Sequence, residues 1–398
     1  MALSKIDVAN MLTGVTPVAN GGTAATTLAG AGLQRPLSKP IIINGNMDIA
    51  QRATSKTGLT NGDGGYHTVD RWRWHENGSS SSVWTMTQET LTSGNAYADG
   101  FHKALKLDCT TAHSSIGTGD TLAIEHRLEK DDLSAFKKGT ANALGFTFGF
   151  WVKATKTGTN VVEIQDQTND RTISGTYTIS SSDTWEHKIV SFPADTTGNF
   201  GTGVTLGLII RFYLYAGTEY TSGGLQSSWG AATTTKRATG QVNNADSTSN
   251  NFHLTGVQLE VGEFTSSTIP DFQHESFADN FARCARYFFR VAQHGADGLS
   301  NQTIGTGYYK NTDQFRVSVY LPVTPRTNPS LVSGSASNAY VIDIQGSTDY
   351  VDDFTLTRSN AKIIQVMHNN SDASGTIGEA GEIATDNSSG IIDFDAEL

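Results

Sequence analysis

The 398-residue chain has only two cysteines, Cys109 and Cys284, and no long apolar segment. Two cysteines cannot build a disulfide framework, so each is expected to be buried as a small apolar side chain. No apolar run approaches the roughly 20 residues that a membrane-spanning helix needs. The N-terminus lacks the apolar core of a secretory signal peptide. We therefore expect synthesis in the cytosol, no membrane insertion and no export by the signal-peptide route.

Charged residues are also scarce. They make up 17% of the chain, and acidic residues outnumber basic ones, which gives a net charge of −11. Because no cluster of Lys and Arg compensates, electrostatics oppose binding to a nucleic-acid backbone. The sequence also lacks zinc-protease, Cys-x-x-Cys, EF-hand, P-loop and nucleophile-elbow motifs. It therefore predicts no nucleic-acid partner, no metal, no cofactor and no catalytic residues.

Glycine, in contrast, is abundant, with 41 residues, and Ser, Thr and Asn are frequent. These residues compete with helical hydrogen bonding or favour turns. From residue 41 to residue 270, many segments alternate with the period of two that is typical of strands. In the segment 146–153, one face carries Phe146, Phe148, Phe150 and Val152, and the other carries Thr147, Gly149, Trp151 and Lys153. The pattern predicts an antiparallel jelly-roll β-sandwich over 41–270.

Three other regions differ from this sandwich. Residues 1–40 carry little charge and are either a flexible tail or an attachment arm that becomes ordered against a partner. In 271–291 one linking helix is predicted, with Ser276 and Asp279 as a capping box and a helical spacing of Phe277, Phe281, Cys284 and Phe288. Residues 292–398 alternate again, which predicts a second, C-terminal β domain. Within the sandwich, the alternation of 252–261 changes parity at Gly256, which predicts a β-bulge.

Aromatic side chains are the best candidates for ligand contact, because the C–H faces of sugars are apolar and stack on exposed rings. Core burial is the simpler interpretation for the four tryptophans in strand patterns, Trp72, Trp74, Trp151 and Trp185. Trp229 lies in the loop 223–235 beside Gln226 and is expected to be exposed. A second candidate set, near a glycine-rich turn, contains Tyr308, Tyr309 and Asn311.

The sequence contains four motifs, at residues 43–52 (INGNMDIAQR), 69–72 (VDRW), 150–154 (FWVKA) and 254–262 (LTGVQLEVG). In sequence and order they resemble a jelly-roll, carbohydrate-binding-module-like domain of bacteriophage tail fibres. Residues 284–288 (CARYF) and 391–398 (IIDFDAEL) resemble the same family. Residues 18–23 (VANGGT) resemble the motif of fibre shafts and attachment segments. The motif residues are expected to frame the sandwich and not to contact ligand.

The resemblance implies a homotrimeric receptor-binding protein of the virion tail, assembled in the host cytoplasm. Residues 1–40 would attach it to a tail adaptor or nozzle protein, with candidate contacts Val18, Asn20, Gly21 and Gly22. Residues 292–398 would be the distal, receptor-facing part, and adsorption to host cell-surface polysaccharide or lipopolysaccharide would be multivalent. Two alternatives remain open: a polysaccharide depolymerase tailspike, and a structural tail appendage without receptor contact.

Overall fold

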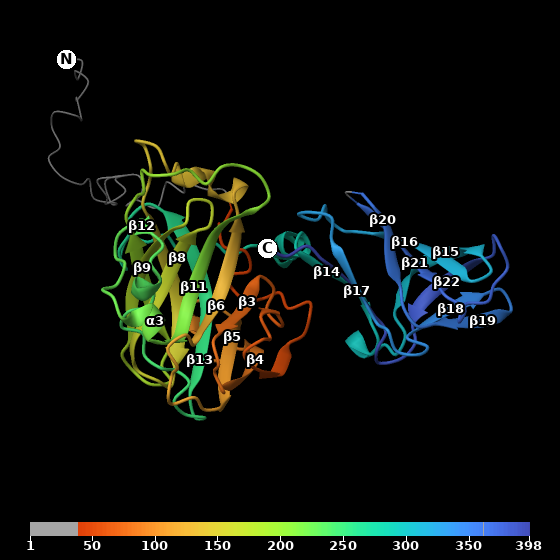
Figure 1. The fold of residues 1–398 in the computed structure, drawn as a ribbon, viewed down its shortest axis with the longest axis horizontal. Coiled ribbons are helices and arrows are strands. Elements are labelled where there is room, and N and C mark those ends of the chain that lie inside the picture. Colours follow the sequence, from red (N-terminus) through yellow and green to blue (C-terminus); the bar gives the residue numbers. More distant parts are fainter. Residues whose placement is uncertain (1–38, 361) are drawn as a thin grey trace, which may run out of the picture.

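The computed structural model describes residues 39–360 and 362–398. The predicted tail contacts Val18, Asn20, Gly21 and Gly22 lie outside these residues. The described chain forms two β domains, with a short helix between them (Figure 1). This confirms a mainly β protein with antiparallel sheets. Over the described ranges, no helix is long and apolar enough to span a bilayer.

The larger domain is a jelly-roll sandwich of two antiparallel sheets. The first sheet has the order β1 (Ser55–Leu59), β4 (Val83–Thr90), β5 (Lys103–Thr111), β13 (Asn251–Val261), β7 (Phe146–Ala154) and β10 (Glu186–Phe192). The second has the order β12 (Gly230–Ala231), β9 (Arg171–Ile179), β8 (Gly158–Asp166), β11 (Leu206–Ala216), β6 (Thr121–Glu129), β3 (Trp72–Asn77) and β2 (Gly65–Tyr66). The connections contain the short turns α2 (Asn95–Ala98), η2 (Asp131–Phe136), α3 (Thr218–Thr221) and η3 (Thr234–Lys236). Most connections cross from one sheet to the other, as a jelly roll requires.

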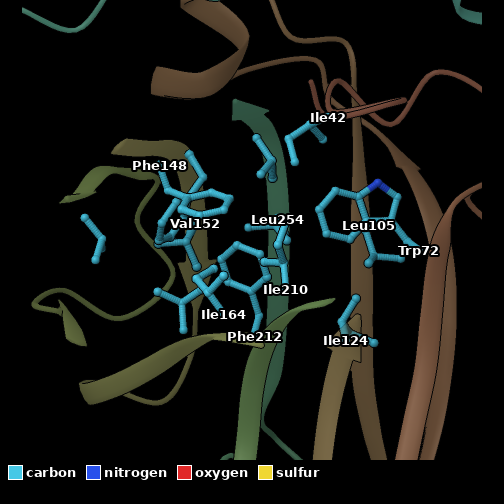
Figure 2. Packing of buried hydrophobic residues seen from close by; sticks show 14 of the residues in the cluster. Ile42, Trp72, Leu105, Ile124, Phe148, Val152, Ile164, Ile210, Phe212 and Leu254 are labelled. Carbon is cyan, nitrogen blue, oxygen red and sulfur yellow. The ribbon is translucent and has the colours of Figure 1, made fainter. Parts of the chain in front are cut away.

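The core lies between the two sheets (Figure 2). Phe148 and Val152 of β7 face Ile210 and Phe212 of β11, and all four side chains are fully buried. The alternation predicted for 146–153 is thus confirmed. Core burial is confirmed for Trp72, Trp74 and Trp185, and both cysteines are buried and free.

The predicted helix is present, but it is shorter than the predicted segment 271–291. Helix α4 spans Phe277–Ala285 and begins at Ser276, whose side chain accepts a hydrogen bond from the backbone N of Asp279, so the cap is as predicted. The last part of the segment is wrong, because strand β14 (Phe288–Gln293) follows. It pairs with β23 (Ile391–Asp395), from the far end of the chain, and this pairing satisfies its backbone hydrogen bonds.

The C-terminal domain is a second, smaller pair of sheets with its own core. The first contains β14, β23 and β17 (Ser330–Ser333). The second has the order β19 (Ser347–Val351), β18 (Tyr340–Ile344), β22 (Ala380–Thr385), β15 (Thr303–Asn311), β16 (Gln314–Tyr320), β21 (Ile363–Asn369) and β20 (Thr355–Ser359). The turn η4 (Ala296–Gly298) lies between β14 and β15.

The two domains meet at a set of residues that we call the junction: Arg52, Arg71, Tyr287, Asp395 and Glu397. Arg71 is fully buried, forms an ion pair with Glu397, and lies 3.5 Å from the ring centre of Tyr287. Arg52 binds Asp395 at 3.0 Å and Glu397 at 3.4 Å. All five residues come from the motifs that resemble tail fibres. These motifs therefore build the contact between the domains.

We expect the substitution Glu397→Gln to lower the free energy of unfolding by about 3 kcal/mol, because it leaves the buried Arg71 without its carboxylate. Chemical denaturation measures this change. The matched control is Glu382→Gln on an exposed strand position, where, among the described residues, the Glu382 side chain binds only the hydroxyl of Thr303 (2.7 Å). A change of about 0.5 kcal/mol or less is expected there. Equal effects of the two substitutions would contradict this role of the junction.

Because of Asp70, which lies next to the junction, we expect the stability of the fold to depend on pH. Burial raises the pKa of Asp70 from 3.8 to about 6, although Arg52 opposes the shift. The folded state therefore binds this proton more tightly than the unfolded state, and ionisation of Asp70 costs stability as the pH rises from about 4 to about 7. Relative to the Asp70→Asn variant, the wild-type chain should lose stability over this range. A difference that stays constant with pH would contradict the prediction.

Candidate functional site

A cleft of about 560 Å³ opens on the outer face of the first sheet. Its floor is formed by Trp151 on β7, His187 on β10 and Gln258 on β13. One wall is the turn after α2, with Asp99 and Phe101, and the other is the segment after β13, with Ser266, Ile269, Pro270, Asp271, Phe272 and His274. The strands thus supply a rigid floor and two loops supply the walls.

The Trp151 ring is held from two sides and remains partly exposed. It stacks on the imidazole of His187, with 5.1 Å between ring centres and 27° between ring planes. Its indole Nε1 donates a hydrogen bond to a carboxylate oxygen of Asp99 at 3.0 Å. Burial lowers the pKa of His187, against the opposing effect of Asp99, so this imidazole is neutral at neutral pH. A ring fixed in this way loses little conformational freedom when a ligand stacks on it.

The bulge predicted at Gly256 is confirmed, and it places Gln258 in the cleft. The pairing of β13 with β7 shifts between Thr255 and Gln258, and Gly256 has a φ of +61°. Phe252 and Leu254 face the core before the bulge, and Val257 and Leu259 face it afterwards. Gln258 consequently points outward, where its amide Nε2 donates to the carbonyl of Pro270 at 3.1 Å. Its Oε1 has no hydrogen-bond partner among the described residues.

The cleft combines apolar rings with polar groups at its rim. Among the described residues, no group of three or more His, Cys, Asp or Glu side chains is arranged to hold a metal ion. The arrangement fits a neutral ligand with an apolar face and several hydroxyl groups, since pockets of this kind orient ligands through a few placed polar atoms.

The predicted ligand residues Trp229 and Gln226 lie outside the cleft. Trp229 is half-buried instead of exposed, because its ring packs against the core and its Nε1 donates to the carbonyl of Pro193 at 2.9 Å. Gln226 supports the same loop, and its backbone carbonyl accepts a hydrogen bond from the N of Ser174 at 2.7 Å.

The other predicted set lies on β15 of the C-terminal domain. Tyr308 and Asn311 are exposed, but Tyr309 is fully buried. Its ring packs on Phe315, with 5.0 Å between centres, and its hydroxyl donates to Asp349 at 2.5 Å. Tyr309 is therefore a core residue and not a ligand contact, because successive residues of a strand face opposite sides. The structure does not bring this set together with Trp229.

Trp151 is the residue that the sequence prediction missed, since it assigned Trp151 to the core. The alternation of residues along β7 already indicated that Trp151 faces away from the core. Phe148 and Phe150 face inward, so the pleat turns Trp151 outward.

No protein-family model and no curated protein sequence matches the chain. Solved structures with similar sandwiches include the enzymatically active domain of tailspike protein 4 from bacteriophage CBA120, at 14% identity and a TM-score of 0.27. The match covers 52% of this chain, which spans only 21% of that one.

Carbohydrate-binding modules are also among the similar structures. The family 11 module of cellulase Lic26A-Cel5E from Clostridium thermocellum is 10% identical, with a TM-score of 0.26 and coverage of 53% of this chain and 98% of the module. The module-containing xylanase 10B of the same organism is 12% identical, with a TM-score of 0.24 and coverage of 63% and 35%. Likeness at this level does not bear on function.

We expect Gly256→Ala to destabilise the sandwich by about 3 kcal/mol, because a Cβ there would lie 2.6 Å from the Phe101 ring at a left-handed φ. The control Gly58→Ala has a similar φ of +72° and open space around it. It should cost only about 1 kcal/mol. Thermal or chemical unfolding compares the two, and equal costs would contradict the tight packing of Phe101 on the bulge.

Proposed function

We propose that the chain is a glycan-binding tail-fibre protein of a bacteriophage and that the cleft at Trp151 holds a sugar of the host surface. The observation that carries this proposal is the partly exposed Trp151 ring, held by His187 and Asp99 in a cleft whose walls carry both apolar and polar groups. A pyranose ring has apolar C–H faces and a rim of hydroxyl groups. It can therefore stack on the indole while its rim meets Gln258 and His274.

The proposed role in the virion is supported by the sequence motifs and by multivalency. Four of the motifs that resemble tail fibres (43–52, 69–72, 284–288 and 391–398) meet at the junction, where they join the body of the protein to its C-terminal domain. One shallow cleft gives weak binding, but three copies per fibre would raise the effective concentration of the remaining sites after the first contact. Attachment through residues 1–40 and trimer formation are parts of the same proposal, but the sugar contact is proposed in the sandwich and not in the C-terminal domain.

We expect Trp151→Ala to weaken binding to lipopolysaccharide or capsular polysaccharide from candidate host bacteria by about tenfold, since the lost ring contact is worth roughly 1 kcal/mol or more. The matched control is Trp229→Ala, which removes a half-buried tryptophan outside the cleft. Binding of the trimeric chain to immobilised polysaccharide measures both variants. Loss of binding in Trp229→Ala alone would overturn the assignment of the site.

The two alternatives give different results in the same preparation. A depolymerase would release new reducing ends from the polysaccharide steadily, whereas a binding protein leaves the polymer intact. A structural appendage would leave phage adsorption unchanged when Trp151→Ala virions are compared with wild-type virions.

A further inference from the structure

Three arginines converge on one buried carboxylate at the outer face of the second sheet, on the opposite side of the sandwich from the cleft. Glu125 of β6 is fully buried. Its carboxylate binds Arg73 Nη1 of β3 at 3.2 Å, Arg127 Nη2 of β6 at 2.8 Å and Arg211 Nε of β11 at 2.7 Å. Burial opposes ionisation of Glu125, but Arg211 and the neighbouring cations outweigh it and lower the pKa to about 2.

The cluster carries more positive than negative charge. Arg211 also binds Glu163 at 3.2 Å, and Arg237 binds the same carboxylate at 2.6 Å. Among the side chains alone, four guanidinium groups thus surround two carboxylates, an excess of two positive charges in a chain whose net charge is −11. Burial lowers the pKa of the adjacent His75 to about 4, so that this imidazole adds no charge at neutral pH.

Some of the positively charged side chains of the cluster are partly exposed to solvent. The side chains of Arg73, Arg127 and His75 are 19%, 17% and 27% exposed. Within the described residues, the hydrogen bonds of Arg73 leave from Nη1, to His75 and Glu125. Its Nη2 lies beside Gly64, where a Cβ would come within 3.3 Å. Arg127 Nη1, in contrast, donates to a main-chain oxygen of Leu398, the last residue of the sequence, at 2.8 Å.

We propose that this arginine cluster, Arg73, Arg127 and Arg211, binds an oxyanion carried by a glycan, either the carboxylate of an acidic sugar or a phosphate group. A purely structural network would be neutral with two arginines for its two glutamates. The additional guanidinium groups are costly to desolvate without an anion, and their planar edges match carboxylate and phosphate oxygens. The glycan as carrier rests on the function proposed above, but the binding of the oxyanion does not depend on the cleft.

The test uses the full-length protein and three probes at low salt: a galacturonic acid trimer, inorganic phosphate and neutral maltotriose. Calorimetry or NMR titration should show saturable binding of at least one anionic probe to the wild-type chain. Arg73→Gln should weaken that binding by about tenfold or more, because it removes a charge-assisted hydrogen bond. Glu125 keeps Arg127 and Arg211 in this variant, and circular dichroism verifies its fold.

The matched control is Arg171→Gln, since Arg171, on β9 of the same sheet, is 18% exposed and binds Asp195. It should bind the anion as the wild-type does. If only the galacturonic acid trimer binds, the oxyanion recognised is a sugar carboxylate. If only inorganic phosphate binds, it is a phosphate group. No anion binding, or equal binding by wild-type and Arg73→Gln, overturns the proposal. Trp151→Ala separates the two sites, because it should retain anion binding even if the cleft holds no sugar.

Discussion

The ion pair between Arg71 and Glu397 is the interaction on which the arrangement of the two domains depends. A guanidinium group that is fully buried needs both a counter-charge and close packing, and Glu397 and the ring of Tyr287 supply them. Glu397 follows β23, which lies between β14 and β17 in the C-terminal domain. The ion pair therefore holds the sheet of one domain against the sandwich of the other (Figure 1).

The sandwich carries a group of potential ligand-binding side chains on each of its two outer faces. The first sheet carries the aromatic and polar cleft around Trp151, and the second carries the arginine cluster around Glu125. The floor of the cleft and the arginine cluster of β3, β6 and β11 both project from strands, whose positions are set by the common core. Sites on such elements are held more accurately than sites on loops alone.

The sequence predicted those features that depend on neighbours along the chain. The alternation around Phe150, the cap at Ser276 and the bulge at Gly256 are local patterns, and the structure confirms them. The strand at 288–293 was missed because its partner, β23, is distant in sequence. The cleft could not be predicted because its walls come from residues 99–101 and 266–274, which only the folded sheet brings together.

Hydrogen–deuterium exchange of the full-length protein, with and without a host polysaccharide that it retains, tests the central claim most directly. Binding in the cleft predicts slower exchange in its two walls, around residues 98–101 and 266–274, and unchanged exchange in residues 303–320 of the C-terminal domain. Protection confined to residues 303–320, with unchanged cleft walls, would contradict the account.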